Sequence, residues 1–250
     1  MKQHLNKVIV AGVLLTGFSS CTTPPEPAPT DWAQEASKQY ELGSFSEAVR
    51  LYEKSIAVDG ASFEAYYALG RCQAQLKQYG KSVKAFEQAI ALGKNSGSTD
   101  LKEAEVRLMI AYYDAGLYDA SIAAAEVVLG TDSTHLQAYA CLAKSHYALK
   151  DFDAALKTYK NYLPKMNPSA PERVGALKQA AFSAYGLKKG AEARKYYEEY
   201  FKLKQAKAQY ITNDDWYWRG QIANVNLETE LKNLYWSKLP KNFLKSKGVK

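Results

Sequence analysis

The sequence predicts an all-α fold, in which about five helical hairpins stack into an α-solenoid that a C-terminal capping helix closes. A small residue followed four positions later by an aromatic one, on the same helix face, recurs along the chain. The pairs are Ala48/Tyr52, Ser82/Phe86, Ser121/Ala125, Ala155/Tyr159 and Ala193/Tyr197, with one aromatic replaced by alanine. The small residues recur at intervals of 34, 39, 34 and 38 residues, close to the period of helical-hairpin arrays. With 47% apolar and 24% charged residues, the chain can bury a core.

The first 20 residues have the composition of an export signal. They contain Lys2 and Lys7 but no acidic residue, and an apolar run follows at 8–15. This order of charged and apolar residues is typical of a signal peptide. The run is shorter than the roughly 20 apolar residues that a membrane-spanning helix needs. We therefore expect residues 1–20 to direct export.

The signal ends in a four-residue motif, Phe18-Ser19-Ser20-Cys21, that resembles the bacterial lipobox. The resemblance implies that Cys21 carries lipid and becomes the mature N-terminus, and such lipidation holds a protein at a membrane. A free thiol after a secretory signal and a disulfide partner are the alternative interpretations of Cys21. Thr22 replaces the aspartate that signals inner-membrane retention in enterobacteria-like sorting, so the resemblance favours the outer membrane.

A proline-rich linker at 21–30 separates Cys21 from the repeats. Four prolines within 22–30 favour an extended spacer of about 3.1 Å per residue, or roughly 28 Å.

Residues 31–204 carry the repeats, and each unit resembles a tetratricopeptide (TPR) helical hairpin. The longer signature is clearest in the second and fourth units: Tyr66, Leu69, Gly70, Tyr79, Ser82, Phe86 and Ala89, then Tyr139, Leu142, Ala143, Phe152, Ala155 and Tyr159. Small residues allow the two helices of a hairpin to approach each other closely. The third unit, with Ala125, and the fifth, with Gly190 at the loop aromatic, match least well.

Two segments rich in helix breakers account for the intervals longer than 34. They are GKNSGSTD at 93–100 and PKMNPSAPE at 164–172. The pattern resumes after each segment, so both are predicted to be turns between units.

Residues 205–237 are predicted to form a helix that covers the open end of the array, as solenoids require. Asn213 and Asp214 are suitable capping residues, and apolar residues follow at helical spacing. The alternative is that Trp216, Trp218 and Trp236 form an exposed docking patch. Residues 238–250 contain five lysines and no acidic residue, as in a solvated basic tail or an anionic-surface binder.

No catalytic motif, metal site or cofactor site is recognised, so the sequence predicts a protein that is not an enzyme. Metalloprotease, redox, hydrolase and phosphate-loop motifs are all missing. His135 and His146 have no carboxylate or cysteine at ligand spacing. Cys72 and Cys141 are predicted to be small buried apolar residues.

Positive charge is concentrated in the C-terminal third. Residues 21–176 carry 16 basic and 19 acidic side chains, a net charge of −3, whereas residues 177–250 carry 15 and 7, a net charge of +8. In an exported protein this favours an acidic protein, peptidoglycan or an anionic lipid surface as partner rather than nucleic acid. For any single lysine, the alternative is a solvated face that aids solubility.

The TPR resemblance also implies a concave groove lined by the first helix of each hairpin. The residues that match its partner-binding positions are Tyr40, Tyr67, Arg71, Tyr113, Lys144, Tyr147, Lys178 and Tyr185, accompanied by Ser37, Ile110 and Phe182. Aromatic rings interspersed with cations suit a bound peptide. TPR sequences often carry tyrosine here, so part of this ladder can belong to the framework. The asparagines that clamp a terminal carboxylate in chaperone-binding members are replaced at Ser37 and Arg71.

Together these features predict a lipid-anchored periplasmic scaffold that binds partner proteins in envelope-complex assembly. In architecture the chain resembles the pilotins of type IV pili, which help a secretin ring to assemble, although its C-terminal tryptophans and basic tail have no counterpart in that resemblance. The alternative is a peptidoglycan-associated adaptor or a cell-wall-binding module, and an enzyme is less favoured.

Overall fold

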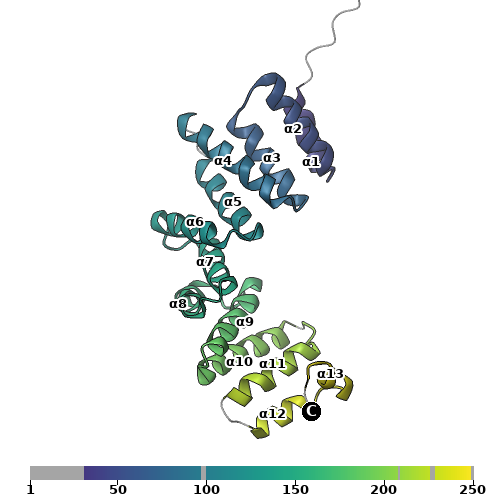
Figure 1. Ribbon diagram of the computed structural model, residues 1–250, viewed down its shortest axis with the longest axis vertical. Helices are drawn as coiled ribbons and strands as arrows, with labels where there is room; N and C mark the ends of the chain where they lie inside the picture. The colour runs from purple at the N-terminus through teal and green to yellow at the C-terminus, as the bar shows by residue number, and fades with distance from the viewer. Residues whose placement is uncertain (1–30, 97–99, 208, 226–228, 249–250) are drawn as a thin grey trace, which may run out of the picture. The chain divides into compact units, whose positions relative to one another are not determined.

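The computed structural model describes residues 31–96, 100–207, 209–225 and 229–248, and Trp32–Lys250 form one compact unit (Figure 1). Within these residues every regular element is a helix, as predicted. The five predicted hairpins pair α1 (Trp32–Glu41) with α2 (Phe45–Asp59), α3 (Phe63–Gln75) with α4 (Tyr79–Ser96), α5 (Leu101–Asp114) with α6 (Tyr118–Thr131), α7 (Leu136–Ala148) with α8 (Phe152–Tyr162), and α9 (Pro171–Gly186) with α10 (Gly190–Ala206). Each second helix also packs against the first helix of the next hairpin.

The turn inside each hairpin repeats one backbone conformation. At Lys150, φ is 63°, and the next amide, that of Asp151, donates to the carbonyl of His146 at 2.9 Å. This bond satisfies a carbonyl at the end of the first helix of the hairpin. Equivalent residues with positive φ are Gly43, Lys77, Gly116 and Lys188. Three of the five positions therefore place a lysine where the left-handed region favours glycine.

Small residues bring the two helices of a hairpin together, as the sequence predicts. A Cβ at Gly70 would lie 2.9 Å from the ring of Phe86. The hydroxyl of Ser82 donates to the carbonyl of Gly70 at 2.8 Å, and Ser121 repeats this bond to Met109 at 3.2 Å. Ala125 is fully buried in place of an aromatic residue, so the third unit keeps the same packing with a smaller side chain.

The C-terminal region differs from the predicted single capping helix. It contains α11 (Asn213–Val225) and α12 (Thr229–Trp236), which pack on each other, while α11 packs on α10. The indole Nε1 of Trp236 donates to the carbonyl of Tyr217 at 3.2 Å, and the two rings stack at 5.9 Å. Trp236 therefore joins α12 to α11.

The three tryptophans of this region pack inside it instead of forming an exposed patch. Trp216 lies against Phe201 and Trp218 against Phe182, each with ring centroids 4.8 Å apart, and all three tryptophans are half-buried. The observed packing therefore favours the capping interpretation.

Residues 238–248 contain a short helix where a frayed tail was expected, although their lysines are exposed. A short helix, α13 (Lys241–Ser246), follows Pro240, and Leu239 is buried. Lys247 pairs with Asp214 at 2.9 Å, which ties the segment to the start of α11. In the part of the chain that the structure describes, no helix combines the length and apolar character of a membrane span.

Candidate functional site

The candidate site is the first-helix surface, formed by side chains of α1, α3, α5, α7 and α9 at the positions predicted for the groove. At its N-terminal end, Arg71 joins two of the predicted tyrosines. Its Nη2 donates to the hydroxyl of Tyr40 at 3.1 Å, and its guanidinium carbon lies 4.7 Å from the ring centroid of Tyr40 and 5.9 Å from that of Tyr67. All three side chains are half-buried. The structure thus brings these residues together on neighbouring first helices.

Beside this cluster lies the α3–α5 cleft, with a volume of about 290 Å³. Its lining combines Tyr40 and Arg71 with Arg107 and Asp114 of α5, and Phe86 and Ile110 supply apolar surface. Burial raises the pKa of Asp114, partly offset by Lys144. The cleft therefore offers an aromatic ring, two guanidinium groups and a carboxylate. Sequence reasoning missed Arg107 and Asp114, although both follow Arg71 on the same surface of the next repeat.

The central tyrosines have a packing role as well as an exposed edge. Tyr113 packs on Tyr118 at 5.7 Å, and Tyr147 packs on Phe152 at 5.5 Å. In both pairs the partner ring begins the second helix of the same hairpin. Lys144 lies 5.9 Å above the Tyr113 ring. Part of the tyrosine ladder therefore belongs to the TPR framework, the alternative that the sequence left open.

The last two predicted residues are engaged by α11. The Nζ of Lys178 lies 3.8 Å from Oδ1 of Asp215, and the ring of Tyr185 meets Trp218 edge-on at 5.7 Å. Both side chains are half-buried. The structure thus separates them from the cluster at Tyr40 and gives them contacts with the C-terminal helices.

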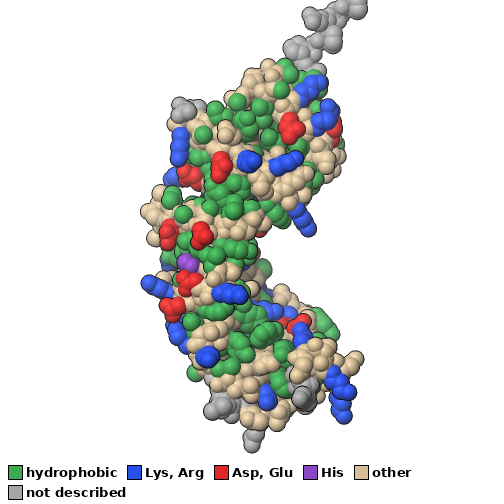
Figure 2. Space-filling model, viewed as in Figure 1, with side chains coloured by type: hydrophobic (Ala, Val, Ile, Leu, Met, Phe, Trp, Pro, Cys, Tyr) green, Lys and Arg blue, Asp and Glu red, His purple; other side chains and the backbone are tan. Residues whose placement is uncertain are grey.

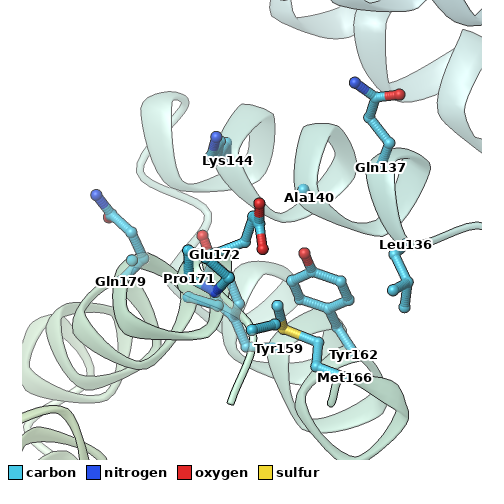
Figure 3. A pocket seen from close by; sticks show the side chains of 13 residues that line it. Leu136, Gln137, Ala140, Lys144, Tyr159, Tyr162, Met166, Pro171, Glu172 and Gln179 are labelled. Atoms are coloured by element: carbon cyan, nitrogen blue, oxygen red, sulfur yellow. The ribbon is translucent and has the colours of Figure 1, made fainter. Parts of the chain in front are cut away.

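A second opening, the α7–α9 cleft, has a volume of about 580 Å³. Figure 3 shows residues of α7 on one side of it and residues of α9 on another. Among the predicted residues only Lys144 lines it. The other lining residues are Leu136, Gln137, Ala140, Tyr159, Tyr162, Met166, Ala170, Pro171, Glu172, Gly175, Ala176 and Gln179. Each cleft lies between two repeats whose interval exceeds 34 residues. The longer intervals are visible in the sequence and could have indicated where the clefts lie.

The cysteines and histidines of the described region have structural surroundings. Cys72 and Cys141 are buried and free, as predicted, and burial raises the pKa of each thiol to about 11. His135 caps α7 by accepting from the amide of Ala138 at 3.2 Å, and His146 lies 3.6 Å from Asp151. Among the described side chains, no group of three His, Cys, Asp or Glu could hold a metal ion. The predicted lipid attachment residue, Cys21, lies outside the described residues.

Charged side chains of both signs occur on the surface of the array. Figure 2 shows acidic and basic groups interspersed on one face, with hydrophobic side chains exposed between them. Such a mixed surface suits a protein partner whose own side chains vary in charge and polarity.

The stacked hairpins, with clefts between their first helices, define an α-solenoid of the class that presents a binding surface along repeated helices. The chain belongs to the tetratricopeptide repeat family, whose model matches residues 34–97 and 107–171.

Solved structures of TPR proteins share this fold. A structure described as "MamA MSR-1 C2" is 18% identical, with a TM-score of 0.59 over 70% of this chain and 96% of that one. Another MamA crystal structure is 20% identical, with a TM-score of 0.61 over 72% and 94% of the two chains. YrrB, described as a TPR protein with an unusual peptide-binding site, is 13% identical, with a TM-score of 0.58 over 70% and 85%. No curated protein sequence matches the chain.

Proposed function

We propose that this protein is a lipid-anchored scaffold of the bacterial envelope that binds an extended segment of a partner protein on its first-helix surface. The α3–α5 cleft is the observation that carries the proposal. Arg71 and Arg107 present donors for backbone carbonyls or acidic side chains, Asp114 presents an acceptor, and Tyr40 presents a ring for stacking. A peptide needs these groups in combination, because its backbone and side chains offer donors, acceptors and apolar surface together.

The mixed charge of the cleft argues for a protein segment over a simple anion. Arg71 is already hydrogen-bonded to a neutral hydroxyl, and Arg107 pairs with Glu103 at 2.8 Å. A partner therefore competes with existing contacts and is selected by shape as well as charge.

The envelope location in this proposal comes from the N-terminal sequence. Phe18-Ser19-Ser20-Cys21 follows a short apolar run, and the proline-rich linker would hold the first hairpin away from the membrane. An outer-membrane lipoprotein of this kind would serve the assembly of an envelope complex such as a secretin or a type IV pilus. Mass spectrometry of the mature protein should find an acylated Cys21 as its first residue.

Affinity purification from detergent-solubilised envelopes tests the binding function. The tagged wild-type protein should retain one or two stoichiometric partners, and the double substitution Arg71→Ala and Arg107→Ala should reduce that retention by about tenfold, as for loss of an interface hot spot. These arginines are better targets than Tyr113 or Tyr147. Each of those tyrosines packs on another ring of its own hairpin, so its loss would also disturb the fold.

Arg50→Ala is the matched control, since Arg50 is an exposed arginine on a second helix that pairs locally with Glu47. It should retain every partner, and circular dichroism should show equal helicity in all three proteins. Full retention by the double variant would show that the first-helix surface is the wrong site.

The charge of the C-terminal third favours a second candidate, a peptidoglycan-associated adaptor. Lys238, Lys241 and Lys245 are exposed on or beside α13. In that case the protein should co-sediment with purified peptidoglycan, and replacing these three lysines by glutamine should weaken sedimentation without changing partner retention at the α3–α5 cleft.

A further inference from the structure

The α7–α9 cleft has the size and composition of a ligand pocket. Its volume of about 580 Å³ falls in the range of small-molecule and anchor-residue pockets. The walls come from two first helices, while Tyr159, Tyr162 and Met166 come from α8 and the segment that follows it. Helix packing therefore leaves open space here, although these large side chains of the second helix are themselves buried.

Two polar atoms of the lining lack hydrogen-bond partners in the described structure. They are the hydroxyl oxygen of Tyr159, whose side chain is 1% exposed, and Oε1 of Gln179. Buried polar groups in folded proteins are nearly always paired, because an unpaired one loses its bonds to water without replacement. Oε1 of an amide only accepts hydrogen bonds, whereas a tyrosine hydroxyl both donates and accepts. A ligand that satisfies Oε1 of Gln179 must therefore carry a donor.

The buried part of the lining is otherwise apolar and shaped by small residues, whereas Gln137, Lys144 and Glu172 line the cleft from exposed positions. The ring of Tyr162 and the thioether of Met166 are both buried, and sulfur and ring surfaces favour contact with an aromatic group. Ala140, Gly175 and Ala176 line the cleft from α7 and α9. A Cβ placed on Gly175 would meet no atom within 4 Å, so the space beside this helix is open. An aromatic ring fits the buried part of this lining better than a charged side chain, which would lose its water there.

We propose that the α7–α9 cleft takes a tryptophan side chain of the partner segment, with the ring against Tyr162 and Met166 and the indole N–H donated to Oε1 of Gln179. This inference rests on the proposed function, because it names the anchor residue of the segment bound on the same surface. Phenylalanine fills the cleft but has no donor. The single neutral donor on a large ring distinguishes tryptophan from both aliphatic and cationic side chains.

Methionine-methyl NMR on the full-length protein tests the proposal with N-acetyl-tryptophanamide as the probe. The chain has three methionines. Met166 lines the cleft, and Met109 is fully buried in the core of another hairpin. The probe should shift the Met166 signal saturably through the ring current of the indole and leave the Met109 signal in place. N-acetyl-phenylalaninamide should bind about five-fold more weakly, as expected for loss of one hydrogen bond.

Three substitutions sharpen the test. Gly175→Leu should fill the cleft and abolish the Met166 shift, while Gly130→Leu, at a helical glycine of α6 whose Cβ would also meet no atom, should leave it unchanged. Neither should lower the thermal midpoint, because leucine favours helix more than glycine does. Gln179→Met should reduce the affinity for N-acetyl-tryptophanamide to that for the phenylalanine analogue.

A Met166 signal that ignores the probe, a Gly175→Leu variant that responds like wild type, or equal binding of the two analogues would overturn the proposal. Tighter binding of N-acetyl-tyrosinamide would do the same. If Met166 does not respond while Arg71→Ala and Arg107→Ala together still lose the partner, the tryptophan anchor is wrong and the proposed function stands. If Met166 responds but no variant loses a partner, the pocket is correct and the proposed function is wrong.

Discussion

The Nζ of Lys204 at the end of α10 lies 2.6 Å from Oδ2 of Asp215 in the first turn of α11. Asp215 also accepts hydrogen bonds from the hydroxyl of Tyr200 at 2.5 Å and from the amide and hydroxyl of Thr212 at 2.8 Å. Its side chain is 1% exposed. A carboxylate can be buried at this junction because charged and neutral donors surround it. This network fixes the C-terminal helices to the fifth hairpin.

The first prediction is that Asp215 stabilises the protein in a pH-dependent way. Burial alone would raise its pKa, but hydrogen bonds from Lys204, Tyr200 and Thr212 lower it from 3.8 to about 2. The stabilisation is fully present above the unfolded pKa near 4 and is lost as pH falls towards 2, with a total of about 2 kcal/mol.

Urea unfolding of wild type and Asp215→Asn at pH 7, 4 and 2.5 measures this effect. At pH 7 the variant should lose about 3 kcal/mol, because Lys204 remains half-buried without its partner, and the difference should shrink as the pH falls. Asp214→Asn is the control, since Asp214 is exposed and pairs with Lys247 at 2.9 Å. A pH-independent difference between wild type and Asp215→Asn would contradict the assignment.

The second prediction concerns the contact that joins α11 to α12. A Cβ on Gly220 would overlap Nε1 and Cδ1 of the Trp236 indole. Gly220→Ala should therefore displace the indole, break its hydrogen bond to Tyr217, and cost about 2 kcal/mol. Tryptophan fluorescence should move to longer wavelength as Trp236 becomes exposed.

Gly130→Ala is the matched control for that substitution, because its Cβ would meet no atom within 4 Å. It should stabilise α6 by about 0.5 kcal/mol, since alanine favours helix over glycine. Equal stabilities of the two alanine variants would mean that Trp236 does not occupy this position.

The third prediction is that a glycine at the turn of the fourth hairpin stabilises the protein. Lys150 adopts φ 63°, and Gly43 and Gly116 have similar positive angles at the equivalent turns. The left-handed conformation costs a lysine about 1–2 kcal/mol, and the greater freedom of glycine in the unfolded chain offsets part of that. Lys150→Gly should therefore raise the free energy of unfolding by about 0.5 kcal/mol. Lys157→Gly, at an exposed position inside α8, should instead lower it by about 1 kcal/mol, and thermal melts distinguish these outcomes.

The hairpins could be predicted from the sequence because their determinants are local. Ser82 and Gly70, or Ala155 and Tyr159, lie within one repeat, and their spacing fixes which faces meet. The division of 213–236 into two helices could not be predicted, because its apolar spacing is compatible with one continuous helix. Trp236 packs over Gly220 across the two helices, a contact that local spacing does not encode.

The first-helix surface was predictable in part for the same reason. Tyr40 and Arg71 occupy related positions on neighbouring repeats, so the period places them side by side. The repeat period does not encode contacts with α11. There Asp215 contacts Lys178, and Trp218 contacts Tyr185. The α7–α9 cleft was missed because several of its lining residues come from a second helix and from the segment after it, where the TPR resemblance assigns no binding position.

The last prediction uses the cysteines to test both the core and the lipid anchor. Cys72 and Cys141 are 0% and 7% exposed, and burial raises the pKa of each to about 11. Since thiolate is the reactive form, neither should react readily with a disulfide reagent at pH 8 while the protein is folded. In denaturant both cysteines should react with the reagent, whereas an acylated Cys21 should not. Two thiols per chain should therefore react in the mature protein. The unacylated Cys21→Ser variant provides the reference for that count. A third thiol in the mature wild-type protein would exclude the lipid anchor, and rapid reaction of the folded protein would show that Cys72 or Cys141 is accessible.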